Sequence, residues 1–422
     1  MKLSGIEVSI DIPKSIILLC VLILPLVDNL TGALFKLGVL SEGAIGSPSQ
    51  LARVSMLLIL FFASFQFSQS RVILFKFFAL LGFMLLTESV VAFFHVNPKA
   101  YIFGVVFLTK VLFFFLLYEF LKAWIQCRDD AYAFIMKSAV LYGVVISITL
   151  IAAYISGFHI PNYEGRGAAT RGLFVSGNGI GITLGIACLL SLYANYLSNK
   201  LSYLCYSILM LFSIVLIGTK AALVLSIICF SVLAFLCWRR APILTLILFL
   251  SCIFFFYSHL VSFLSLVFEN ILSKLNSDYD KVQILASSRD VFIKDAFSVI
   301  NWNDWKSLRF LFGGGAYYSY LDFWYSQSVI RKTLENDFFE LFFCYGILMA
   351  LLFTVLLIRG MVKGILSGKI FIVMCLFLIS MHSLLAGHVL FNGTSSIMLS
   401  IVLALAFTST SSDIRDRWAK SG

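Results

Sequence analysis

Residues 208–217 read Ile-Leu-Met-Leu-Phe-Ser-Ile-Val-Leu-Ile, and residues 370–379 read Ile-Phe-Ile-Val-Met-Cys-Leu-Phe-Leu-Ile. Such runs are apolar on nearly every face of a helix, whereas a strand of a membrane β-barrel alternates apolar and polar positions over about ten residues. Similar runs recur along the chain, and a helix needs about 20 residues of this kind to span a bilayer. The sequence therefore predicts an all-α, polytopic membrane protein.

The composition excludes other classes of protein. Of the 422 residues, 61% are hydrophobic and 12% are charged, against about 45–50% and 25% in soluble domains, so a water-soluble enzyme is excluded. The formal net charge is +10, but the basic residues form no long tract, and we expect no nucleic-acid partner. The nine cysteines fall mostly inside apolar runs without a CxxC pair, which predicts packing residues rather than disulfides or zinc ligands.

The apolar runs predict about 12 transmembrane helices. They are expected near residues 15–36, 51–69, 72–94, 101–121, 133–157, 175–197, 201–218, 221–238, 241–262, 336–358, 370–387 and 390–408. The chain then divides into a membrane domain of nine spans (1–262), a large loop with short helices (263–335), and three further spans with a tail (336–422). Within the loop we expect a flexible glycine turn at Gly313–Gly315, followed by an aromatic strip that begins at Tyr317.

Lys and Arg residues set the expected orientation, because short cytoplasmic loops carry their excess. With the N-terminus inside, sixteen of them fall in cytoplasmic segments and six in the short outer connections. We therefore expect both termini in the cytoplasm of a bacterium, the spans in its inner membrane, and the long structured loop on the periplasmic face.

Two outer connections carry cations that suit an anion. The 158–178 connection places Arg166 and Arg171 in a glycine-rich stretch that runs into a span beginning near Asn178. Glycines and a helix N-terminus let the backbone approach an anion, and arginine offers a planar fork of donors to phosphate. Lys220 lies in the tight turn Gly218–Ala222. For each cation, a role as a solvated or snorkelling loop residue stays open.

A third charged group belongs to the long loop and to its return into the membrane. Arg289 lies within the loop, and Glu335, Asn336 and Asp337 precede or begin the tenth span, with Glu340 about one turn further. A carboxylate at the edge of the bilayer is costly unless it is paired or used. Acidic residues also suit the start of a helix, so a capping role remains the alternative for the first two acids.

Other polar residues lie inside or between the spans. His388 occupies the outer turn before the last span, where it serves either the bundle or a catalytic site. Asp28, Glu88 and Lys110 are embedded in apolar runs. We expect Lys110 to pair with Glu88 or Glu119 as a structural contact between helices.

The order of these motifs resembles the Wzy-type O-antigen polymerases, which are related to the O-antigen ligases. The resemblance covers most of the chain: an Arg-bearing loop into Gly-Leu-Phe and Gly-Asn-Gly-Ile-Gly, then Gly-Thr-Lys-Ala-Ala, one long loop with Ser-Ser-Arg-Asp and Phe-Gly-Gly-Gly, Glu-Asn-Asp-Phe-Phe-Glu, and a late Gly-His-Val-Leu-Phe. Ligases usually carry a His-Asn pair where this sequence has Glu335-Asn336, and an Arg where it has Lys220. These departures favour a polymerase over a ligase.

The resemblance implies a glycosyltransferase of the GT-C type that works without a metal ion or cofactor. Its donor and acceptor would both be oligosaccharide repeats linked to undecaprenyl diphosphate, with a Wzz-type chain-length regulator and a flippase as partners. Without a metal, fixed cations have to stabilise the departing diphosphate. We assign this role to Arg166, Arg171, Lys220 and Arg289, with Asn178 and Asn336 in the binding site.

The acceptor hydroxyl needs a general base, for which Glu335 is the first candidate, Asp337 the second, and His388 a helper. The Asp-x-Asp at 278–280 is interpreted as a solvated pair rather than a metal site. Two other functions remain open. One is an O-antigen ligase, and the other is a flippase or transporter of lipid-linked oligosaccharide, which would place its charges near the midplane of the bilayer.

Overall fold

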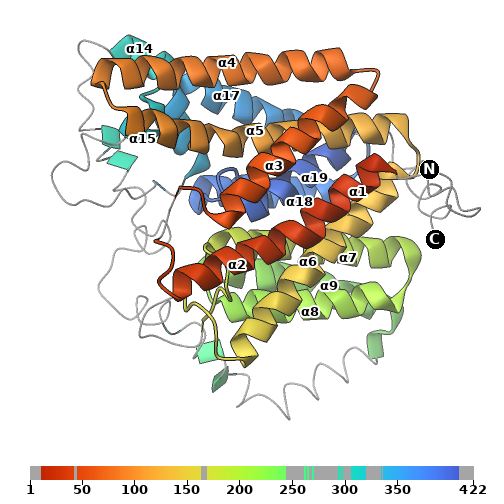
Figure 1. The fold of residues 1–422 in the computed structure, drawn as a ribbon. Coiled ribbons are helices and arrows are strands. Elements are labelled where there is room, and N and C mark those ends of the chain that lie inside the picture. Colours follow the sequence, from red (N-terminus) through yellow and green to blue (C-terminus); the bar gives the residue numbers. More distant parts are fainter. Residues whose placement is uncertain are drawn as a thin grey trace, which may run out of the picture.

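The computed structural model describes residues 11–41, 45–162, 169–243, 261–262, 264–265, 269, 293–294, 296–297, 306–319, 334 and 336–407. Within these ranges the regular structure is helical, apart from one isolated antiparallel bridge between Pro161 and Thr170. The helices lie side by side in a single bundle (Figure 1).

The first span consists of α1 (Ile12–Leu18), a π-helical turn (Leu19–Ile23) and α2 (Leu24–Lys36). Pro25 lies in the first turn of α2 and lacks the N–H that would continue the regular ladder, and the wider π turn stands just before it. The other long helices are α3 (Pro48–Ala63), α4 (Ser70–His95), α5 (Pro98–Cys127), α6 (Ala131–Ile155), α7 (Gly177–Ser198), α8 (Leu201–Ile217), α9 (Lys220–Arg240), α17 (Asp337–Leu366), α18 (Ile370–Leu385) and α19 (Gly393–Ala406).

Among the residues with described structure, eight helical segments are long and apolar enough to cross a membrane, and α8, α18 and α19 are shorter apolar helices. Each coincides with a span predicted from the sequence, with ends shifted by at most eight residues. The structure therefore confirms a polytopic, α-helical membrane protein. The predicted span at 241–262 falls mainly outside the described ranges.

Successive helices alternate in direction, so the N-termini of α3, α5, α7, α9, α17 and α19 lie at one end of the bundle, on the left in Figure 1. Two short helices of the long loop, α14 (Lys306–Phe312) and α15 (Gly315–Tyr318), lie at the same end. We call it the α15 end. It is the end that the distribution of Lys and Arg predicts to face outward.

Helix α7 lies at the centre of the bundle because its small residues let neighbouring helices approach. In its most apolar window 83% of the residues are buried, against 28% in the peripheral helices α3, α4 and α9. A Cβ on Gly185 would lie 3.1 Å from Leu225 of α9, and one on Gly179 would lie 2.7 Å from the side chain of Asn392. The start of α7 therefore lies against the start of α19.

The glycines of the long loop allow close packing rather than flexibility. Gly313 (φ 80°) and Gly346 (φ 79°) face each other: a Cβ on Gly313 would lie 2.3 Å from the backbone of α17, and one on Gly346 would lie 2.0 Å from the carbonyl oxygen of Leu311. The N–H of Gly314 donates to the carbonyl of Phe343 (2.9 Å). Gly346 also kinks α17. The predicted flexible turn is thus a fixed junction between the loop and α17.

Candidate functional site at the α15 end

The connection between α6 and α7 forms a short hairpin stem that rests on the end of α8. The N–H of Ile160 donates to the carbonyl of Gly172 (2.7 Å) across the stem. The N–H of Thr170 donates to the carbonyl of Leu216, in the last turn of α8 (2.9 Å). Tertiary contacts therefore join the two outer connections that carry cations, which lie about 50 residues apart in the sequence.

His159 fixes the base of this stem. Its Nδ1 lies 2.8 Å from the hydroxyl of Thr170, and its carbonyl oxygen accepts a hydrogen bond from the ammonium of Lys36 (2.6 Å). Partial burial and the charge of Lys36 lower the pKa of His159 below its ordinary value. The imidazole is therefore neutral at pH 7.

Arg171 lies at the end of the stem and organises the approach to α7. Its Nη1 donates to the carbonyl of Val175 (2.6 Å), one residue before the N-cap Ser176. Asn178 is half-buried in the first turn of α7. Arg166, in the same connection, lies outside the described ranges.

Lys220 is the first residue of α9, which is capped by the hydroxyl of Thr219. A cation in the first turn opposes the helix dipole, so its position there does not stabilise α9. Because the stem of the hairpin rests on the preceding turn, Lys220 lies on the same side of the bundle as Arg171. This placement suits binding of an anion better than it suits the stability of the helix.

The start of α17 forms a polar corner with the turn between α18 and α19. The carboxylate of Asp337, 1% exposed, accepts hydrogen bonds from the hydroxyl of Ser383 (2.7 Å) and the N–H of Val389 (3.0 Å) through one oxygen. Asn336 caps α17 by accepting from the N–H of Phe339, and its amide donates to the carbonyl of Leu384. Both residues therefore hold this turn in place.

His388 lies in the turn that Asp337 fixes, directly before Val389. It is half-buried and has a left-handed backbone (φ 60°), and its carbonyl accepts from the hydroxyl of Ser395 (2.7 Å). Glu340, 3% exposed, accepts from the N–H of Leu334 (3.3 Å). Of the predicted catalytic residues, the structure thus brings Asp337 and His388 together. Glu335 and Arg289 lie outside the described ranges.

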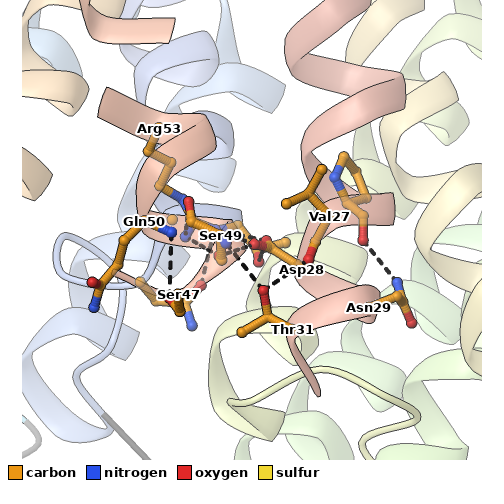
Figure 2. Close-up of polar contacts among 12 residues, drawn as sticks. Val27, Asp28, Asn29, Thr31, Ser47, Ser49, Gln50 and Arg53 are labelled. Carbon is orange, nitrogen blue, oxygen red and sulfur yellow. Dashed lines mark hydrogen bonds and ion pairs between the residues drawn. The ribbon is translucent and has the colours of Figure 1, made fainter. Parts of the chain in front are cut away.

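The sequence did not single out one polar cluster next to this corner. Asp28 of α2 pairs with Arg53 of α3 through contacts of 2.6 and 2.7 Å, and also accepts from the hydroxyls of Ser49 and Thr394, the latter at 3.0 Å (Figure 2). The sequence identifies Asp28 as an embedded charge, whereas Arg53 falls at the start of an apolar run, where it is one of the six basic residues of the short outer connections. The sequence did contain a signal for this ion pair, namely an acid near the end of one span and an arginine near the start of the next.

Glu119, one of the two acids predicted to pair with Lys110, pairs with other lysines. Its carboxylate lies 2.8 Å from Lys76 and 3.7 Å from Lys122, near the opposite end of the bundle. Glu88 accepts the N–H of Ala316 (2.8 Å) and so anchors α15. Lys110 lines a cavity with Asp28 and Arg53, and its pairing with Glu88 stays a prediction.

The aromatic residues of α15 are engaged within the protein. The ring of Tyr318 stacks on His95 at 3.9 Å between centroids, and its hydroxyl accepts from the amide of Asn97 (2.9 Å). Tyr317 contacts Phe103 edge to face. These contacts dock the loop on α4 and α5.

The described part of the chain holds no group of three or more His, Cys, Asp and Glu residues arranged to bind a metal ion. Fold and site together define a polytopic helical membrane protein in which Arg171, Lys220, Asp337 and His388 lie at one end of the bundle. No family model, curated protein or solved structure matches this chain. Its function is therefore argued below from its own residues.

Proposed function

We propose that this protein is a surface-polysaccharide polymerase of the O-antigen type. It transfers a glycan from undecaprenyl diphosphate to the terminal sugar of a second repeat linked to the same lipid. The proposal includes 12 spans in the bacterial inner membrane, cytoplasmic termini, and chemistry at the periplasmic face by the α15 end. A chain-length regulator and a flippase are its expected partners.

One observation carries the proposal: Arg171, Lys220, Asp337 and His388 come from separate segments and lie at the same end of the bundle. The hairpin rests on α8, α7 begins against α19, and the turn before α19 is held by α17. These contacts link the segments that carry the two cations to the turn that carries His388. The placement of these four residues at one end supports chemistry at one face of the membrane.

The reaction needs both kinds of residue. The acceptor hydroxyl forms a bond to the anomeric carbon, the bond from that carbon to the phosphate oxygen breaks, and the diphosphate leaves with the electron pair. Arg171 and Lys220, with Arg166 and Arg289, stabilise the negative charge that develops on the diphosphate. The proton of the hydroxyl passes to a base, which is Glu335 or His388 in this proposal.

Asp337 fits a positioning role better than that of the base. Its carboxylate is buried, and one oxygen already accepts two hydrogen bonds from the turn that carries His388. A base has to reach the acceptor hydroxyl directly or through one water molecule. We therefore rank Asp337 below Glu335 and His388.

The test is the length distribution of the surface glycan. The gene is deleted, and the strain is complemented with wild type, Arg171→Ala, Lys220→Ala, Arg289→Ala or Glu335→Gln at matched membrane levels. Arg128→Ala and Lys200→Ala serve as controls, because both residues are exposed near the opposite end of the bundle. We expect the four site variants to leave single repeats on the lipopolysaccharide core, and the controls to restore the full ladder.

Other outcomes would identify the competing functions. A bare core with long glycan accumulating on undecaprenyl diphosphate would indicate a ligase. Single lipid-linked repeats retained on the cytoplasmic face would indicate a flippase. An unchanged ladder in the deletion strain would contradict all three.

A further inference from the structure

A cavity of about 200 Å³ opens near the α15 end, among α2, α3, α5, the start of α19 and the segment before α7. Asp28 and Arg53, whose contacts are drawn in Figure 2, line this cavity. Pockets that enclose drug-sized ligands are larger, at about 300–1,000 Å³. The volume suits a compact headgroup instead.

The charged residues that line this cavity are Asp28, Arg53 and Lys110, which leaves one net positive charge. Asp28 engages Arg53 with both carboxylate oxygens and so fixes the guanidinium in one orientation. The ammonium of Lys110 borders the same cavity. The cavity therefore offers an anion two cations, a guanidinium held by Asp28 and an ammonium on α5.

Lys110 lies far inside the bundle. It is 12 residues after Pro98, the first residue of α5, which at 1.5 Å per residue corresponds to roughly 18 Å along the helix. A cation at such depth is costly unless it faces a polar space, and it marks a functional site by default. Its ammonium lies 5.3 Å from the ring of Phe107, which stacks on Phe391.

The other walls match the two parts of a phosphorylated lipid. Three helices begin at the cavity, with Ser47, Ser176 and Asn392 as their N-caps, so the positive ends of α3, α7 and α19 point toward it. Phe113 and Phe174 supply an apolar side. Cations and helix ends suit the phosphates, and the aromatic wall suits the first carbons of the lipid.

We propose that this cavity binds the diphosphate headgroup of a polyprenyl-linked lipid, at a site distinct from Arg171 and Lys220. The naming of the lipid rests on the proposed function, in which donor and acceptor each carry such a group. One diphosphate departs at the hairpin and the α9 turn. The cavity then holds the diphosphate of the second substrate, which stays attached to its lipid.

The test is a binding measurement on the full chain, purified in detergent and titrated with undecaprenyl diphosphate and with undecaprenol, its phosphate-free counterpart. We expect the wild type to prefer the diphosphate by at least about tenfold, and Lys110→Gln to lose about tenfold in affinity, because one hydrogen bond to a charged group is lost. The matched control is Lys99→Gln, an exposed lysine of the same helix that does not line the cavity. It should bind within twofold of the wild type.

Further variants separate loss of binding from loss of fold. Lys110→Arg keeps the charge and should bind like the wild type, and a thermal unfolding curve of each variant establishes that it is folded. Displacement of the lipid by inorganic pyrophosphate would support recognition of the diphosphate alone. Preference over undecaprenol without such displacement would support recognition of the diphosphate on its lipid.

Three results would overturn the proposal. They are equal affinity for undecaprenol and undecaprenyl diphosphate, equal binding of phosphatidylglycerol, and unchanged binding by folded Lys110→Gln. The outcome is separable from that of the polymerase test. Binding that depends on Lys110 in a protein whose deletion leaves the ladder intact would sustain the site and reject the function. A lost ladder with unchanged binding would do the reverse.

Discussion

Replacing Asp28 by asparagine removes the charge that neutralises Arg53 inside the bundle. The side chains of Asp28 and Arg53 are 9% and 16% exposed. The carboxylate accepts four hydrogen bonds, two from Arg53 and one each from the hydroxyls of Ser49 and Thr394. In asparagine an NH2 group, which is a donor, replaces one of the two acceptor oxygens. At least one of the four donors would then face this NH2 group instead of an acceptor.

The expected loss in the free energy of unfolding is about 3 kcal/mol. Removing one partner of a buried ion pair costs about 3–5 kcal/mol, and Arg53 borders the cavity, where solvation offsets part of this loss. A similar contact at the surface should be worth far less. Asp130 and Lys14 lie 2.7 Å apart with side chains 41% and 32% exposed, so Asp130→Asn should cost no more than about 1 kcal/mol.

The assay is unfolding in mixed micelles by titration with sodium dodecyl sulfate, followed by tryptophan fluorescence. It compares wild type, Asp28→Asn, Arg53→Gln, the double variant and Asp130→Asn. The double variant should cost about 2 kcal/mol less than the sum of the two single ones, because each single change leaves its partner unsatisfied. Additive costs, or equal costs for the Asp28 and Asp130 variants, would refute the reasoning from burial.

Three further outcomes are expected. Gly346→Ala should lower thermal stability and release α14 from α17, since Gly346 has a positive φ and the new Cβ would lie 2.0 Å from a backbone carbonyl of α14. The control Gly82→Ala, with open space around it in α4, should leave stability unchanged or raise it by up to about 1 kcal/mol. Equal effects of the two substitutions would contradict this account. Glu119→Gln should lower the free energy of unfolding by about 1–2 kcal/mol in the same micelle titration, because Lys76 loses its 2.8 Å partner; no change would show that the pair is not formed. The stem of the hairpin should open more readily as the pH falls below about 6.5, the ordinary pKa of histidine. His159 has a lowered pKa in the folded protein, so it binds a proton more readily once the stem opens. Hydrogen exchange of the stem, corrected for intrinsic rates, should therefore rise at low pH in the wild type and not in His159→Gln.

Much of the fold was predictable because a helix in lipid is determined locally. Each span satisfies its own backbone hydrogen bonds, and only its side chains meet the hydrocarbon. The apolar run at 208–217 therefore identifies α8 without reference to any other segment. The same holds for helix N-caps: Asn336 before α17 and Ser176 before α7 each accept a hydrogen bond from a backbone N–H three residues further along the chain.

The glycines of the long loop mark a limit of local reasoning. Three consecutive glycines predict a flexible turn when only the sequence is known. In the fold, Gly313 lies against the backbone of α17 at its kink, so the absence of a side chain serves close contact. Which use a glycine has depends on what packs against it.

The candidate site was predictable in part. The sequence placed the cations of the hairpin and of the α9 turn on one side of the membrane, because helix direction alternates and charge sets the orientation. It did not predict that the carboxylate of Asp337 accepts hydrogen bonds from the turn at His388, or that Asp28 forms an ion pair with Arg53. These contacts join residues about 50 and 25 positions apart.

The sequence by itself determined the class of protein, the course of its spans and the end of the bundle at which Arg171, Lys220, Asp337 and His388 lie, since hydrophobicity and charge act segment by segment. Only the tertiary structure decided which charges meet. Glu119 was one of two acids expected beside Lys110, yet its carboxylate lies beside Lys76, and Lys110 lines a cavity together with Asp28. The rotation of each helix about its axis and the choice of its neighbours arise from packing across the whole bundle, and no local pattern contains them.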